Sequence, residues 1–126
     1  MKITPELVVE SVENSINFYQ NFLDFHLVDK VGNDKFCCWA KMESNDKSTE
    51  IMFVKTESVV DEIPEIGSRN DAGRIILLIE VDNINYLYSK FKDKEFILKD
   101  LYKTDYDTNE FVIKDIDGYI LNISER

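Results

Sequence analysis

The chain has 126 residues, of which 44% are hydrophobic and 12% aromatic, so it is long and apolar enough to fold around a core without cross-links. Its formal net charge is −10, and a field of that sign repels phosphate backbones and anionic membrane surfaces, which disfavours nucleic-acid binding. No apolar run reaches the roughly 20 residues of a membrane span, and no apolar signal segment follows Met1, so we expect no membrane insertion and a cytoplasmic location.

The first half of the chain predicts one strand, one helix and three further strands. Residues 3–9 alternate in polarity and are rich in branched side chains, which is typical of a strand. Ser11 is a good N-cap, and apolar side chains recur after it at helical spacing, so we expect a helix that ends near Leu23 or Asp24. Strands are predicted over residues 25–29, 35–42 and 49–55, with polar turns between them.

The same order of elements returns in the second half. Residues 56–72, with Pro64 and Gly67, interrupt the pattern and read as a connector that has room for one helical turn. A strand over 74–81, a helix capped by Asp82 or Asn83, and strands over 96–102, 110–114 and 119–124 follow. The two helices start about 70 residues apart, which indicates an internal repeat.

We therefore predict an α+β fold of two βαβββ modules, which pair into a curved mixed sheet around a cleft. A single domain over residues 1–126 would contain module one at about 1–55, the connector at 56–72 and module two at about 73–126. Each module would leave the concave face of its sheet open, and a cleft between two such faces suits a small molecule.

Three segments carry a resemblance to a known family. They are the opening (residues 5–9, 15–19 and 23–25), the start of the second half (residues 81–88) and the ending (residues 109–121). The ending is the most specific, because Asn-Glu-Phe followed by Asp-Ile-Asp-Gly-Tyr resembles an Arg-Glu-Phe and Asp-Pro-Asp-Gly-Tyr pattern, with Ile116 in place of the proline. Together they resemble the glyoxalase/bleomycin-resistance/dioxygenase family of the vicinal-oxygen-chelate superfamily. This chain has Asp24 at a position where that family carries a glycine.

The resemblance implies four positions for ligands of a divalent metal ion, which fall on Thr4, Glu50, Ile76 and Asn122. Only Glu50 is anionic, and an isoleucine contributes nothing to a hard-cation site. The single histidine, His26, is predicted at the surface, and the adjacent Cys37 and Cys38 lack metal-ligand spacing and read as reduced thiols. We expect no metal, no cofactor and no catalytic residues, and the resemblance then implies the metal-free, bleomycin-resistance-like branch.

Alternation along the strands selects the side chains that share a face with these four positions. With nearby aromatic residues they give the candidate ligand-binding set: Glu6, Phe36, Trp39, Glu50, Met52, Tyr102, Tyr106 and Asn122. Phe36 and Trp39 are placed on the third strand as stacking platforms, whereas the opposite-facing Phe53 is expected in the core. The leading hypothesis is a protein that sequesters a small molecule, and the acidic charge favours a cationic or aromatic one.

Two alternatives stay open, because one fold hosts many functions. One is a lyase or dioxygenase-type enzyme with an atypical metal site at Glu50, and the other is an accessory protein whose cleft is filled by side chains. Pro5 lies where bleomycin-resistance proteins carry a proline near the first strand. The resemblance therefore implies a homodimer as the partner state, with exchange of the first strand as an option.

Overall fold

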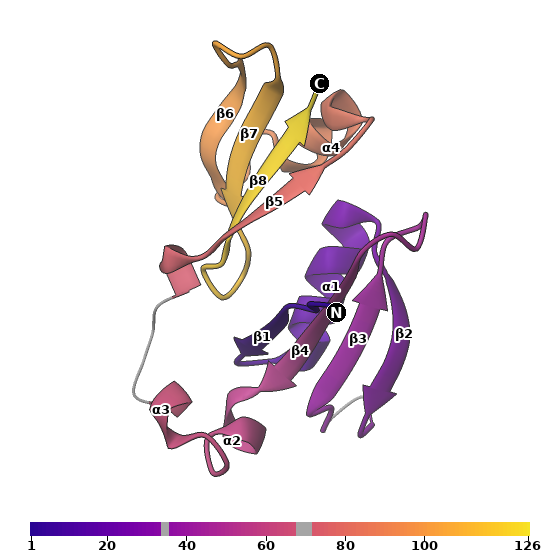
Figure 1. The fold of residues 1–126 in the computed structure, drawn as a ribbon, viewed down its shortest axis with the longest axis vertical. Helices are drawn as coiled ribbons and strands as arrows, with labels where there is room; N and C mark the ends of the chain where they lie inside the picture. Colours follow the sequence, from indigo (N-terminus) through magenta and orange to yellow (C-terminus); the bar gives the residue numbers. More distant parts are fainter. Residues whose placement is uncertain (34–35, 68–71) are drawn as a thin grey trace. The chain divides into compact units, whose positions relative to one another are not determined.

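The computed structural model describes residues 1–33, 36–67 and 72–126. The chain divides into two compact units, Met1–Asn70 and Asp71–Arg126, and each packs one main helix on one face of a four-stranded sheet (Figure 1). The predicted α+β class with two βαβββ modules is confirmed, whereas the single domain and its exact limits stay predictions. None of the helices in the described part of the chain has the length and apolar character that a membrane crossing requires.

Module one contains β1 (Glu6–Val9), α1 (Val12–Leu23), β2 (His26–Val31), β3 (Trp39–Glu43) and β4 (Glu50–Lys55). The sheet order is β1-β4-β3-β2, with β1 parallel to β4 and the other neighbours antiparallel. Tyr19 of α1 packs on Phe53 of β4, with ring centroids 4.9 Å apart, and both side chains are buried. The core prediction for Phe53 is confirmed.

Local chemistry sets both ends of α1. Ser11 Oγ accepts a hydrogen bond from the Asn14 backbone N–H at 3.2 Å, as its N-cap assignment predicts. Asp24 ends the helix in the left-handed region at φ 57°. Asp and Asn tolerate this region better than most residues, so Asp24 can stand at the position where the family carries a glycine.

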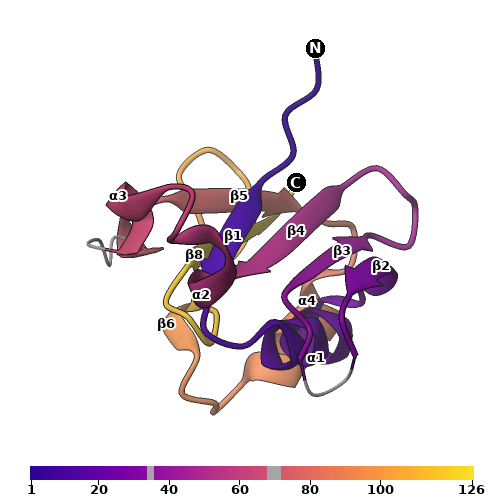
Figure 2. The same cartoon turned by 90° about the horizontal axis from the view of Figure 1, so that it is seen from below.

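Two strands of module one begin three or more residues later than predicted. β1 starts at Glu6 rather than at residue 3, and Pro5, which has no N–H to donate, precedes it; residues 1–5 extend from the strand (Figure 2). β3 starts at Trp39 rather than at residue 35, so the placement of Phe36 on this strand was wrong. Phe36 lies in the preceding loop, 72% exposed, and its backbone N–H bonds to Asn33.

The two cysteines also lie before β3, and not on the strand where they were predicted. Both are free thiols, and Cys37 is buried like a small apolar side chain.

Beyond β4, the connector contains two short helices rather than one turn, α2 (Thr56–Val59) and α3 (Pro64–Gly67), and a 3-10 turn at Ala72–Arg74 follows.

Module two contains β5 (Ile76–Glu80), α4 (Ile84–Phe91), β6 (Ile97–Lys103), β7 (Asn109–Lys114) and β8 (Ile120–Glu125). Its order, β5-β8-β7-β6 with β5 parallel to β8, repeats that of module one. Phe91 of α4 packs on Phe111 of β7 with ring centroids 5.9 Å apart. The turn before β8 follows the predicted chemistry, because Asp115 Oδ1 accepts the backbone N–H groups of Asp117 and Tyr119 and Gly118 takes φ 92°.

The cap of α4 differs from its prediction. Asn83 occupies the N-cap position, but its side chain makes no capping hydrogen bond. Instead, Glu125 Oε2 of β8 accepts the Ile84 backbone N–H at 2.8 Å. A carboxylate from the last strand therefore stabilises the first turn of the helix.

Candidate functional site

Each sheet buries one face against its helix, and the opposite face carries most of the predicted site residues. In module one the buried side chains of β3 and β4 are Ala40, Met42, Ile51 and Phe53. The alternate positions point to the other side of the sheet and are half-buried. This open face contains Trp39, Glu50 and Met52, and Glu6 of β1 lies directly opposite Met52 in the strand register.

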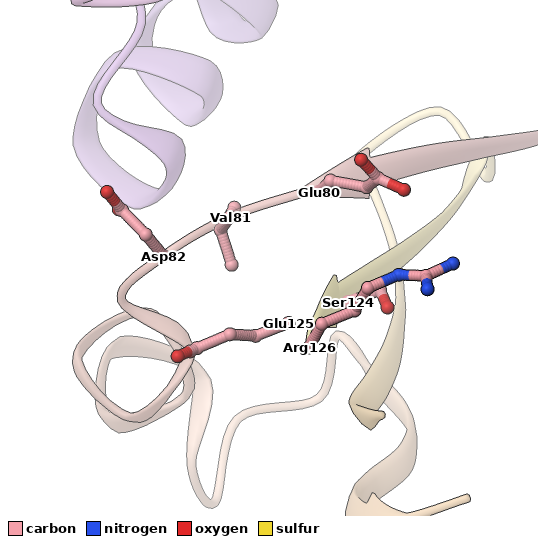
Figure 3. A pocket seen from close by; sticks show the side chains of 6 residues that line it. All are labelled: Glu80, Val81, Asp82, Ser124, Glu125 and Arg126. Carbon is pink, nitrogen blue, oxygen red and sulfur yellow. The ribbon is translucent and has the colours of Figure 1, made fainter. Parts of the chain in front are cut away.

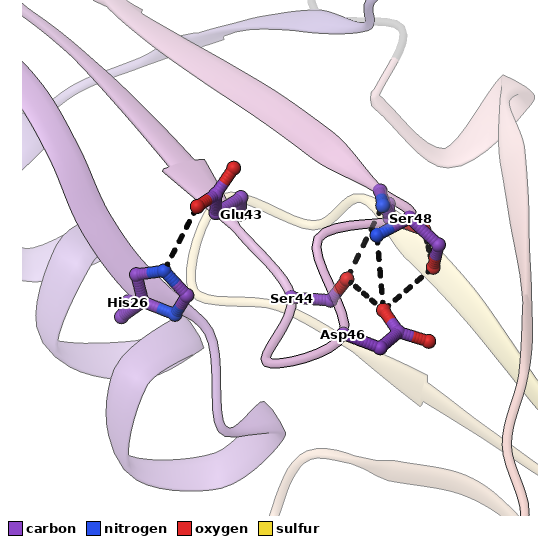
Figure 4. Close-up of polar contacts among 6 residues, drawn as sticks. His26, Glu43, Ser44, Asp46 and Ser48 are labelled. Carbon is purple, nitrogen blue, oxygen red and sulfur yellow. Dashed lines mark hydrogen bonds and ion pairs between the residues drawn. The ribbon is translucent and has the colours of Figure 1, made fainter.

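Two glutamates have polar partners at one end of this open face. Glu50 and Glu43 lie opposite each other on β4 and β3. Glu50 bonds to Lys2 Nζ at 2.7 Å, and Glu43 Oε1 lies 3.1 Å from His26 Nε2 (Figure 4). The hydrogen bond from Lys2 lowers the pKa of Glu50, against an opposing effect of burial. Glu50 is therefore an ion-paired carboxylate.

The turn between β3 and β4 has its own acidic centre at Asp46. Its Oδ1 accepts hydrogen bonds from the Ser44 and Ser48 hydroxyls, both at 2.7 Å, and from the Ser48 backbone N–H (Figure 4). These bonds lower the pKa of Asp46 to about 2. All three partners belong to the turn, so this arrangement closes the hairpin.

Module two holds a more enclosed polar cluster around Glu110 of β7. Glu110 is only 4% exposed. Glu110 Oε2 accepts hydrogen bonds from Thr108 Oγ1 at 2.9 Å, Ser124 Oγ at 3.3 Å and, more weakly, Tyr106 OH at 3.4 Å. Its Oε1 accepts from Asn122 Nδ2 at 3.2 Å. The two carboxylate oxygens therefore meet four neutral donors, which we call the Glu110 cluster.

The cluster keeps Glu110 ionised. Burial by itself raises the pKa of this carboxyl, but the hydrogen bonds from Thr108, Asn122, Ser124 and Tyr106 outweigh it and hold the pKa below its usual value. The pKa of Tyr106 is raised, by burial and by the charge of Glu110, so its hydroxyl remains a donor.

Asn122 contributes an acceptor that the protein leaves unpaired. Its Nδ2 must face Glu110, because an ionised carboxylate only accepts hydrogen bonds. Its Oδ1 is buried and has no hydrogen-bond partner among the described residues. An unpaired buried carbonyl costs about 1–3 kcal/mol, so such an atom calls for an explanation.

The predicted residues of module two meet at this cluster. Tyr106 and Asn122 bond directly to Glu110, and Tyr102 of β6 is its cross-strand neighbour. Glu110 itself was missing from the predicted set, although it belongs to the Asn-Glu-Phe segment. The strand alternation was applied only to strands that carry metal-ligand positions, and β7 carries none. Extending it across the β7–β8 pair would have found Glu110 opposite Ser124.

A pocket of about 240 Å³ adjoins the cluster at the ends of β5 and β8 (Figure 3). It is lined by Glu80, Val81, Asp82, Ser124, Glu125 and Arg126. Ser124 belongs to both features, because it lines the pocket and donates its hydroxyl to Glu110.

The four positions at which the family places metal ligands do not suit a metal ion here. Ile76 has no donor atom and Glu50 is paired with Lys2, so only the neutral oxygens of Thr4 and Asn122 remain as donors. Within residues 1–33, 36–67 and 72–126, no group of three or more His, Cys, Asp or Glu side chains is placed to hold an ion. The donor set therefore does not fit a divalent-metal centre.

Comparisons with known proteins agree with the architecture. The profile of the Glyoxalase/Bleomycin resistance protein/Dioxygenase superfamily matches residues 3–123. A protein of unknown function from Agrobacterium tumefaciens is similar at a TM-score of 0.80 and 17% identity, covering 100% of this chain and 94% of that one. TioX from Micromonospora sp. ML1 is similar at 0.72 and 12%, covering 100% and 96%.

A glyoxalase/bleomycin resistance protein/dioxygenase family enzyme from Burkholderia phytofirmans is similar at a TM-score of 0.77 and 16% identity, covering 95% of this chain and 94% of that one. No curated protein sequence matches the chain significantly. Identities this low show a shared fold alone.

Proposed function

Since the chain belongs to the Glyoxalase/Bleomycin resistance protein/Dioxygenase superfamily, we propose that it is a metal-free small-molecule-binding protein of the bleomycin-resistance-like kind. In this proposal it holds a ligand without transforming it. The observation that carries the proposal is the Glu110 cluster, an ionised and nearly buried carboxylate beside the unpaired Asn122 Oδ1. A few fixed polar groups on a largely apolar surface are typical of ligand sites.

The chemistry of the acidic groups favours binding over catalysis. A general base works best when its pKa lies near the operating pH, and the pKa of Glu110 is shifted in the opposite direction. Glu50, the residue at which an enzyme of this fold would need an atypical metal site, pairs with Lys2. Both carboxylates therefore suit electrostatic recognition better than proton transfer.

Module one carries predicted ligand-binding residues of its own on its open face. Trp39 and Met52 supply apolar surface, and Glu6 and Glu50 supply negative charge at its margin. Phe36, Tyr102 and Tyr106 add aromatic rings, of which Phe36 and Tyr106 are largely exposed. With a net charge of −10, this composition favours an aromatic cation.

We also propose a cytoplasmic homodimer in which the first strand can be exchanged. The support is the extended segment before β1, where Ile3 is 86% exposed. Light scattering distinguishes the dimer from the monomer by molar mass. A mass of 14.8 kDa, that of one chain, at micromolar concentration would contradict the dimer.

Trp39 gives a direct test of binding, because it is the only tryptophan in the chain. We expect its fluorescence to change saturably on titration with a bleomycin-type cationic glycopeptide, and to do so equally after treatment with EDTA. Trp39→Phe controls for signals that arise from the ligand itself. An unchanged emission with cationic and neutral aromatic compounds alike would count against the proposal, as would a response abolished by EDTA.

A further inference from the structure

The open face of module two holds a buried anion and an unpaired acceptor next to each other. The two groups are joined by the bond from Asn122 Nδ2 to Glu110 Oε1 at 3.2 Å. We infer that Glu110 and Asn122 form the subsite for a protonated primary amine of the ligand. This inference rests on the proposed function and adds the chemical class that the site takes.

Glu110 carries a negative charge that its hydrogen-bond partners do not neutralise. Its hydrogen-bond partners Thr108, Asn122, Ser124 and Tyr106 are all neutral, and no Lys, Arg or His is among them. Buried carboxylates are normally paired with a cation, because neutral donors orient toward the charge without cancelling it. The net negative charge of the cluster is thus available to a cationic group.

The hydrogen-bonding groups of the subsite also match an amine. A primary ammonium group has three donors and no acceptor. It therefore matches a carboxylate together with the unpaired Asn122 Oδ1. A carboxylate or phosphate ligand would present acceptors to acceptors and add repulsion, so it is disfavoured at this position.

The groups around the cluster also bear on the binding of a cation. The pocket that shares Ser124 with the cluster carries Glu80, Asp82 and Glu125 against Arg126 as its one cation, so its balance is acidic. On the neighbouring strand, the Tyr102 ring already carries an ammonium group, because Lys99 Nζ lies 3.8 Å from its centroid. Tyr106, 70% exposed, offers a second ring for the apolar part of an amine.

Three probes of similar size separate charge from hydrogen bonding. They are benzylammonium (a cation with N–H donors), benzyltrimethylammonium (a cation without donors) and benzyl alcohol (a neutral donor). We expect benzylammonium to bind roughly tenfold or more tightly than either of the others, since a hydrogen bond to a charged group is worth at least that ratio. Two-dimensional NMR should show the Asn122 side-chain amide shifting with benzylammonium.

Two variants tie the preference to the cluster. Glu110→Gln removes the charge and nearly retains the shape, and should abolish the preference for benzylammonium over benzyl alcohol. Glu43→Gln, at a half-buried glutamate of module one, is the matched control and should retain it. If Glu110→Gln does not fold, the three-probe comparison and the Asn122 resonance in the unmodified protein still decide the question.

The outcomes separate the inference from the proposed function. Equal binding of the three probes, or a preference that survives in folded Glu110→Gln, overturns the amine subsite, while saturable Trp39 quenching by a larger aromatic ligand keeps the proposed function. Absence of any probe binding at millimolar concentration also overturns the subsite. The proposed function then stands or falls on the Trp39 titration.

Discussion

Glu110 illustrates how opposing local effects decide the state of a single residue. At 4% exposure the carboxylate loses most of its hydration, which by itself favours the neutral form. Four hydrogen bonds to the charged form reverse this, so the ionised side chain and its donors stabilise one another. The same bonds fix the Asn122 amide and thereby leave its Oδ1 unpaired.

This balance predicts how stability depends on pH. Because the pKa of Glu110 is lower in the folded chain than in the unfolded chain, its contribution is present above pH 4.5, the ordinary glutamate value, and is lost as the pH falls through the folded value. At pH 7 we expect Glu110→Gln to lower the free energy of unfolding by about 1–3 kcal/mol. Urea denaturation at a series of pH values measures this, and the two curves should converge under acid. Parallel curves would show that Glu110 is not stabilised as the anion.

At the scale of elements, the two helices show which features of the fold are readable from the sequence. The ends of α1 were predicted because both signals are local, a Ser at the N-cap and a residue that tolerates left-handed φ after the last turn. The cap of α4 was not, because its acceptor Glu125 lies 41 residues away in the sequence. The start of β3 was misplaced because the apolar run that begins at Phe36 looks like a strand. Phe36 lies instead in the loop after Gly32, and Gly32 has a φ of 101°.

The site was predictable to a similar degree. Tyr106 and Asn122 were found because one is an aromatic residue in a loop near the site and the other stands at a family position. Glu110 was missed because the alternation was applied only to the strands with family metal positions, and because the donors Asn122 and Ser124 lie on another strand. The pairing of Glu50 with Lys2, which bears on the metal question, likewise depends on contact between residues 48 positions apart.

A pair of variants tests the cap of α4. We expect Glu125→Ala to lower the free energy of unfolding by about 0.5–2 kcal/mol, since the Ile84 N–H loses its acceptor. Asn83→Ala should have a much smaller effect, because the Asn83 side chain makes no capping bond. Thermal unfolding monitored by circular dichroism measures both. A larger loss of stability in Asn83→Ala than in Glu125→Ala would show that Asn83, the cap predicted from the sequence, stabilises the helix end.

At the scale of the whole molecule, the chain repeats one topology twice and uses the copies differently. The strand orders β1-β4-β3-β2 and β5-β8-β7-β6 are equivalent, and a parallel pair stands at the same place in each. Module one carries the Lys2–Glu50 ion pair on its open face, whereas in module two the Glu110 carboxylate accepts hydrogen bonds from neutral donors among the described residues. Of the family positions at Thr4, Glu50, Ile76 and Asn122, two lie in each module, and only Glu50 carries a charge.

The most direct test of metal-free binding is the melting midpoint of the EDTA-treated protein with and without a bleomycin-type cationic glycopeptide. A ligand that binds the native state adds about 2.7 kcal/mol at 100 times its dissociation constant. That stabilisation raises the midpoint of a domain of this size by several degrees. We predict such a rise for the unmodified protein and a smaller rise for the Glu110→Gln variant. A midpoint unchanged by this ligand in EDTA but raised after a divalent metal ion is restored would contradict the account.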